Sequence, residues 1–136
     1  MSEILVDNLT GKTSAGSITV TSEGGAATQS LQQGLAKMWV HFDGTATGAT
    51  AQDSFGLSSM ADNGTGDYSC TMSNAMSNAN YCFQCSIEQN TSVNTNNFGS
   101  KDGNAQTTTV LRVACGSETA AIDTDEYCVT VLGDMA

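Results

Sequence analysis

Apolar side chains recur at every second position along much of this chain, which is the spacing of β-strands with one buried face. The clearest case follows the turn sequence Asp62-Asn63-Gly64-Thr65-Gly66-Asp67, where Tyr68, Cys70 and Met72 alternate with polar residues. Asn-Gly and neighbouring Gly and Asp residues favour tight turns between antiparallel strands. The pattern therefore predicts an antiparallel hairpin around this turn.

The same alternation predicts further strands, about six to eight in all, in a chain without proline. They are expected at Trp39 to Asp43, with Met38, Val40 and Phe42 on one side, and at Asp53–Met60, Tyr81–Ile87, Thr107–Cys115 and Tyr127–Leu132. The polar stretch Asn90–Asn104 is interpreted as an exposed loop anchored by Val93 and Phe98. We expect an all-β fold whose residues 39–136 form one compact antiparallel β-sandwich, a jelly-roll-like knob domain.

One short helix, or neck, is predicted at residues 28–38. Leu31, Leu35 and Met38 stand at positions i, i+4 and i+7. Thr28 or Ser30 can serve as the N-cap. So short a helix is marginal in water. We expect its apolar stripe to pack on the following domain or on the equivalent helices of neighbouring subunits.

Residues 1–27 form a segment that cannot fold alone, an extended N-terminal arm. Its apolar residues lie at strand-like spacing between glycine, serine and threonine: Ile4, Val6, Leu9, Ile18 and Val20. They can be buried only against another surface or another copy of the chain. The arm therefore indicates assembly.

The charge of the chain excludes nucleic acid as a partner. Fourteen acidic residues face only four basic ones, Lys12, Lys37, Lys101 and Arg112, which gives a formal net charge of −10. A basic patch cannot be assembled from so few cations. Only 13% of the residues are charged, so the surface is mainly hydroxyl and amide, which is common in β-rich assembly proteins.

No apolar run approaches the ~18 residues of a membrane span, and Met1-Ser2-Glu3 lacks the basic start of a signal peptide. We expect a protein made in a cytosol, without membrane insertion. The cysteines are odd in number, which argues against a secreted disulfide framework. Cys70, Cys82, Cys85, Cys115 and Cys128 are interpreted as reduced and mostly buried.

Cys82 and Cys85 form the single CxxC pair, which could belong to a redox site or to half of a zinc site. No second pair accompanies it, and positions i and i+3 of a strand face opposite sides of the sheet. Structural cysteines are the better interpretation. His41 stands alone in its predicted strand, so we expect a histidine on a sheet surface or at an interface rather than a general base.

Two further patterns are weak. Asp123, Asp125 and Glu126 could bind calcium, yet their spacing does not match an EF-hand loop and a charged turn is the favoured interpretation. Gly11-Lys12-Thr13 lacks the upstream glycine of a phosphate-binding loop. We expect no catalytic residue, no cofactor and no metal.

Three stretches carry a resemblance to a known group of proteins. They are Ile4-Leu5-Val6-Asp7-Asn8-Leu9-Thr10-Gly11-Lys12-Thr13-Ser14-Ala15-Gly16; Ala36-Lys37-Met38-Trp39-Val40-His41-Phe42-Asp43-Gly44; and Asp53-Ser54-Phe55 with residues 59–68 and 76–81. The chain up to about residue 90 resembles tail-fibre and virion-appendage proteins of tailed bacteriophages, especially the short modular ones of marine phages. The last third has no such likeness.

The resemblance implies a non-enzymatic virion structural protein, made in the cytoplasm of the bacterial host. It implies a homotrimer whose arm docks on other virion proteins of the tail or capsid and whose knob faces outward, in a role such as host attachment. We expect Val20, Leu31, Leu35 and Met38 at the subunit contact and Ile4, Val6, Leu9 and Ile18 in virion anchoring.

Two alternatives stay open. A capsid decoration or cement protein would differ only in where the arm docks. A carbohydrate-binding module would recognise host surface glycan through the loops Asn90–Asn104 and Asp62–Asp67, with few aromatic residues to help and Trp39 expected in the core. A polysaccharide-degrading enzyme is the weakest option. It needs two carboxylates a few ångströms apart, which a sequence alone does not show, and the small size of the chain and its lack of a repeat solenoid also argue against it.

Overall fold

The computed structural model describes residues 3–87, 97–103, 106–116 and 120–136. The chain divides into two compact units, Met1–Leu35 and Ala36–Ala136. Within the described residues the protein is all-β, apart from one helix of four residues.

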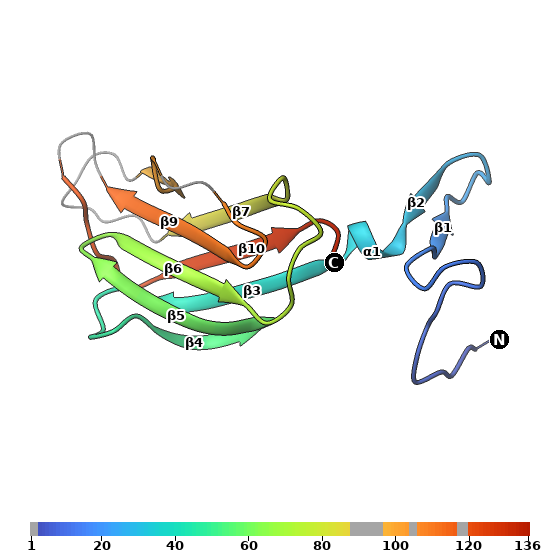
Figure 1. Ribbon diagram of the computed structural model, residues 1–136, viewed down its shortest axis with the longest axis horizontal. Helices are drawn as coiled ribbons and strands as arrows, with labels where there is room; N and C mark the ends of the chain where they lie inside the picture. The colour runs from blue at the N-terminus through green and yellow to red at the C-terminus, as the bar shows by residue number, and fades with distance from the viewer. Residues whose placement is uncertain (1–2, 88–96, 104–105, 117–119) are drawn as a thin grey trace. The chain divides into compact units, whose positions relative to one another are not determined.

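The second unit contains two four-stranded antiparallel sheets (Figure 1). The first has the order β4-β3-β10-β7, formed by β3 (Ala36–Asp43), β4 (Thr50–Phe55), β7 (Cys82–Ile87) and β10 (Tyr127–Leu132). The second has the order β5-β6-β9-β8, formed by β5 (Leu57–Gly64), β6 (Asp67–Met72), β8 (Asn97–Ser100) and β9 (Val110–Gly116). The predicted all-β sandwich is thereby confirmed.

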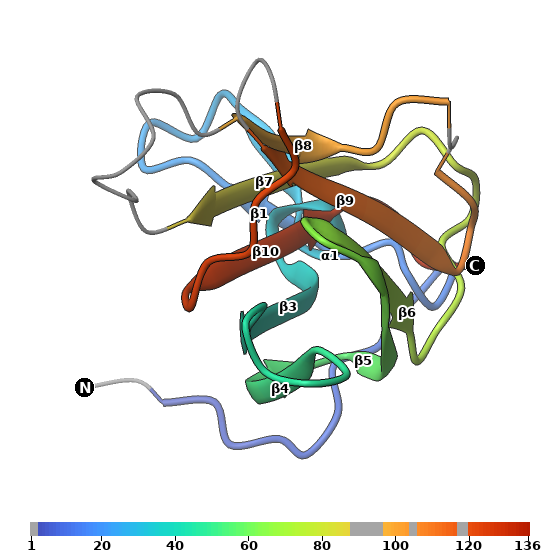
Figure 2. The ribbon, with the colours of Figure 1, turned by 90° about the vertical axis from the view of Figure 1, so that its left-hand side faces the viewer.

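The core lies between the central strands of the two sheets, β3 and β10 on one side and β6 and β9 on the other (Figure 2). Alternate residues of these strands are buried: Met38, Val40 and Phe42; Tyr127, Val129 and Val131; Tyr68, Cys70 and Met72; Leu111, Val113 and Cys115. This is the period-two pattern expected from the sequence. Because Met38 and Val40 face inward, Trp39 between them faces outward and is half-buried, so its expected place in the core was wrong.

The predicted strand Asp53–Met60 is interrupted at Gly56, where the chain passes from the first sheet to the second. Gly56 has φ +67°, and a Cβ atom there would collide with the backbone oxygen of Lys37. Glycine accepts both conditions because it has no side chain. Phe55 and Leu57, which the alternation aligned on one face, therefore belong to different sheets.

The helix is shorter than predicted. α1 covers only Leu31–Gly34, and β2 (Thr28–Ser30) precedes it. Ser30 is its N-cap, as one of the two alternatives predicted, and its side chain accepts a hydrogen bond from the Gln33 amide. The rest of the expected helix is strand, because β10 offers backbone partners to Ala36 and Met38, and these bonds outweigh a weak local helical preference.

The long polar stretch Asn90–Asn104 lies largely outside the described residues. The part that is described includes β8, so the interpretation of the whole stretch as a loop was wrong. β8 pairs with β9, with Phe98 opposite Cys115. Phe98 packs against the core, which is the anchoring contact expected of it.

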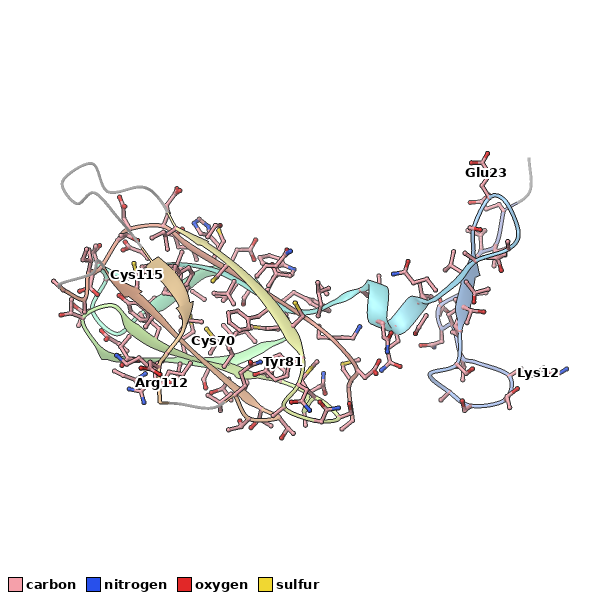
Figure 3. The ribbon with its side chains drawn as sticks, turned by 90° about the horizontal axis from the view of Figure 1, so that it is seen from above. Lys12, Glu23, Cys70, Tyr81, Arg112 and Cys115 are labelled. Carbon is pink, nitrogen blue, oxygen red and sulfur yellow. The ribbon has the colours of Figure 1, made fainter. Side chains whose placement is uncertain are left out.

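The first unit contains a two-stranded hairpin, β1 (Thr19–Thr21) with β2, rather than one continuous extended segment. The Leu31 amide donates to the Ile18 carbonyl at 2.8 Å and ties the start of α1 to the hairpin. Figure 3 shows Lys12 and Glu23 at the ends of two loops of this unit. None of the described residues 3–35 is buried, so this unit has no core of its own.

We expect Gly56→Ala to lower the free energy of unfolding of the sandwich by about 1–3 kcal/mol, the cost of a side chain in the left-handed region. Urea denaturation measures the change. Gly99→Ala is the matched control, because a Cβ atom there meets nothing within 4 Å. A Gly56→Ala protein as stable as the control would mean that the chain passes between the sheets without strain.

Candidate functional site

Four aromatic rings pack together inside the sandwich. The ring of Phe42 stacks on that of Tyr127 with centroids 4.7 Å apart, and Tyr68 meets both rings edge-on at 5.1 and 5.0 Å. Phe98 meets Tyr127 edge-on at 5.1 Å. Such pairs stabilise a core beyond their buried area.

The two tyrosine hydroxyls of this cluster hold the segment that precedes β10. Asp123 accepts hydrogen bonds from the Tyr68 hydroxyl and from the Gly66 amide, both at 2.6 Å. The Tyr127 hydroxyl donates to the Ile122 carbonyl at 3.0 Å. Burial raises the pKa of Tyr68, and it raises the pKa of Tyr127 to about 12, so both hydroxyls stay protonated at neutral pH.

Asp123 is therefore a structural hydrogen-bond acceptor that ties its segment to the turn between β5 and β6. Asp125 and Glu126, its expected companions in a charged turn, are exposed. Among the residues that the structure describes, no group of three histidine, cysteine, aspartate or glutamate side chains could hold a metal ion.

We expect Tyr68→Phe to destabilise the sandwich by about 1.5–3 kcal/mol, the usual worth of a hydrogen bond to a charged group. The control is Tyr81→Phe, whose hydroxyl donates to the neutral Val110 carbonyl at 3.3 Å, and which should cost about 1 kcal/mol or less. Thermal and urea unfolding of both variants give the comparison. Equal losses would show that Asp123 adds nothing to the bond.

An ion-pair network lies across the second sheet. Arg112 in β9 binds Asp67 in β6 through two parallel bonds, Nε to Oδ1 at 2.7 Å and Nη2 to Oδ2 at 2.8 Å. Lys101 reaches the same carboxylate at 3.3 Å. The Arg112 hydrogen bonds, and after them Lys101, lower the pKa of Asp67 although its burial opposes the shift. The network joins β6, β9 and the residue after β8.

The depressed pKa of Asp67 makes this network sensitive to acid. An aspartate in the unfolded chain has a pKa of about 3.9. The stabilisation is complete above that pH and is lost as the pH falls through the lower pKa of the folded state. We expect Asp67→Asn to be less stable than the wild type at neutral pH, and the difference to shrink as the pH falls toward about 2.

Urea unfolding from pH 7 to pH 2 measures this difference. Asp125→Asn, at an exposed carboxylate, is the control and should follow the wild type throughout. A difference between Asp67→Asn and the wild type that stays constant with pH would contradict the assignment of the lowered pKa to Asp67.

All five cysteines are free thiols. Cys70 and Cys115 are buried, and burial raises the pKa of Cys70 to about 12. Cys82 and Cys128 are exposed and Cys85 is half-buried, so the expectation that most of the thiols are buried was wrong (Figure 3 labels the two buried ones). Cys82 and Cys85 point to opposite faces of β7, as the alternation of a strand predicts.

His41 lies on the outer face of β3, as predicted for a sheet-surface histidine. The sheet register places Asp53 beside it on β4 and Cys128 beside it on β10. The His41 side chain makes no hydrogen bond to either neighbour within the described part of the chain.

The residues predicted for assembly are spread over both units. Ile4, Val6, Leu9, Val20 and Leu35 are exposed, whereas Ile18 and Leu31 are half-buried. Met38 differs from all of these, because its side chain is fully buried in the core of its own sandwich. It has no surface left for a neighbouring subunit, since β3 begins two residues earlier and turns its side chain inward.

Three large exposed apolar residues were not predicted from the sequence: Leu5, Phe55 and Met135. Leu5 is 82% exposed and was passed over because it falls between the alternating Ile4 and Val6. Phe55 is 57% exposed on β4, and its alternation with Leu57 concealed this. Gly56, which stands between Phe55 and Leu57, was the signal in the sequence that could have indicated this exposure.

Some side chains of the loops proposed for glycan recognition already make hydrogen bonds or ion pairs, where these loops are described. Around Asp62–Asp67, Asp62 accepts from the Gly64 amide at 2.9 Å and Asn63 donates to Ser69 at 2.9 Å. A hollow of about 580 Å³ borders β8 and β9, but Lys101 in its lining is already paired with Asp67.

No protein-family model, curated protein or solved structure matches this chain. Within the part of the chain that the structure describes, no helix has the length and apolar character needed to cross a bilayer.

Proposed function

We propose that this chain is a non-enzymatic structural protein of a bacteriophage virion, an appendage held by its N-terminal segment, residues 1–35, and displaying the β-sandwich. One observation carries the proposal. The described residues 3–35 contain no buried residue, yet they hold six large exposed apolar side chains: Ile4, Leu5, Val6, Leu9, Val20 and Leu35.

This concentration of exposed apolar surface is what a docking segment needs. Ile4 and Leu5 are each more than 80% exposed. Fully burying one such side chain stabilises an assembly by about 1.5–3 kcal/mol. An isolated two-stranded hairpin is at best marginally stable in water, so β1 and β2 gain most by pairing and packing with other chains.

Within the proposal, the apolar residues divide between two partners. Ile4, Val6, Leu9 and Ile18 anchor the segment on other virion proteins, and Val20, Leu31 and Leu35 meet their counterparts in a homotrimer. The sandwich then serves as the outward knob, with jelly-roll-like connections and a role in host attachment. The likeness of residues 4–16 and 36–44 to virion-appendage proteins supports the virion as the place of action.

A capsid decoration protein is the second candidate, because the same exposed segment would suit a capsid surface equally well. The two candidates differ only in the docking site. Immunogold labelling of intact virions with antibodies against residues 36–136 separates them, since the gold would lie on the tail in one case and on the capsid in the other. Absence of the protein from purified virions, measured by mass spectrometry, would overturn both.

We expect Leu35→Asp to abolish the trimer while changing the free energy of unfolding of the sandwich by less than about 0.5 kcal/mol, because the side chain is 54% exposed in a single chain. Light scattering after gel filtration in reducing buffer gives the mass, and urea unfolding gives the stability. Leu35→Met keeps an apolar side chain and should stay trimeric. A Leu35→Asp protein with the wild-type mass would place the subunit contact elsewhere.

A further inference from the structure

The outer face of the first sheet presents a regular grid of side chains. Directly opposed residues of antiparallel strands point to the same face. The register Trp39↔Phe55, Thr130↔Trp39 and Thr130↔Gln84 therefore sets one row across all four strands: Phe55, Trp39, Thr130 and Gln84. Two residues along, the register sets a second row: Asp53, His41, Cys128 and Ser86.

One end of this grid is aromatic. Phe55 on the edge strand β4 is 57% exposed, and Trp39 beside it on β3 is half-buried. Directly opposed side chains on a sheet have Cβ atoms about 4.5–5.5 Å apart. Trp39 and Phe55 are therefore neighbours on this face, and we call this pair of aromatic side chains the Trp39–Phe55 platform.

The other positions of the grid supply hydrogen-bonding groups that the protein itself does not use. The side chains of Trp39, His41, Gln84, Ser86 and Thr130 make no hydrogen bond within the described part of the chain. Their donors and acceptors include an indole N–H, an imidazole, an amide and two hydroxyls. A hollow of about 440 Å³ lies among Gln84, Cys85, Ser86, Cys128 and Thr130, a volume in the range of small-ligand sites.

The charge of the grid selects the class of ligand. Asp53 is its single carboxylate, and none of its eight residues is a lysine or an arginine. The chain as a whole carries a formal charge of −10, which repels anions. A neutral ligand suits the grid, whereas a phosphorylated or carboxylated one does not.

The apolar area is too small for a subunit contact. Two aromatic side chains bury at most about 150–250 Å² each. A stable protein interface needs about 800 Å² on each partner, with a more apolar centre in homo-oligomers. The Trp39–Phe55 platform is therefore of a size that fits a small ligand better than a second copy of the chain.

We propose that the outer face of the sheet β4-β3-β10-β7 binds a neutral saccharide. The C–H face of a sugar ring would lie on the Trp39–Phe55 platform, and its hydroxyl groups would exchange hydrogen bonds with His41, Gln84 and Thr130. The inference rests on the proposed function, because only a displayed sandwich would meet the glycans of a cell surface. It assigns glycan recognition to a sheet face rather than to the loops considered above.

Trp39 is the only tryptophan of the chain, so its fluorescence reports directly on the proposed site. The full-length protein would be titrated with neutral hexasaccharides of glucose, mannose, galactose and N-acetylglucosamine, each up to about 10 mM. We expect a saturable change in the emission of Trp39 with at least one of them. Hexagalacturonic acid, an anionic hexasaccharide, should cause none.

Two variants test the platform itself. Phe55→Ala should weaken binding by about tenfold or more, the loss typical of removing an aromatic anchor. Phe55→Tyr keeps the ring and should bind within about twofold of the wild type. Thr71→Ala, in β6 of the other sheet, is the surface control and should leave binding unchanged. Urea unfolding confirms that each variant is folded.

Three results would overturn the saccharide site: no saturable change with any neutral hexasaccharide, equal binding by Phe55→Ala and the wild type, or a Phe55→Ala protein whose oligomeric mass changes instead. The last result would mark the face as a contact with another protein chain. None of these results bears on whether the protein is part of the virion. Failure of the saccharide site is therefore distinct from failure of the proposed function, which mass spectrometry of purified virions tests.

Discussion

The pairing of β3 with β10 organises the sandwich. β3 opens the second unit and β10 closes its sequence of strands, yet the two lie side by side at the centre of the first sheet. Val40 pairs with Val129 and Phe42 with Tyr127, so these two pairs place buried side chains side by side. The same pairing ends α1 early, draws Met38 into the core and turns Trp39 outward.

Sequence periodicity predicted the parts of this fold whose strands have one fully buried face. Burial alternates strictly along β9 and β10, and along β6 from Tyr68 onward, and the inward residues are those that the alternation indicated. The turn before β6 was also predictable, because Asn, Gly and Asp favour tight turns. The local sequence is enough to predict these strands because the apolar residues at every second position are also the residues that are buried.

Elsewhere the outcome depended on tertiary partners that a sequence does not display. Residues 28–38 fit a helical stripe as well as a strand, and β10 decided in favour of the strand from Ala36. The change of sheet at Gly56 was hidden because Phe55 and Leu57 alternate correctly across it. β8 has few apolar residues and is a strand because β9 supplies its backbone partners. The Trp39–Phe55 platform depends on the pairing of β3 with β4, so composition alone could not reveal it.

The separation of β3 and β10 along the chain also affects how the protein is synthesised. β3 emerges from the ribosome long before its partner, and its inward face, Met38, Val40 and Phe42, stays without its native cover in the meantime. Contacts between distant segments form late and slow folding. A nascent chain interrupted before Tyr127 would keep this face open and be exposed to proteolysis and aggregation. The pairing of β3 with β10 can therefore be completed only after the chain has been translated through Leu132.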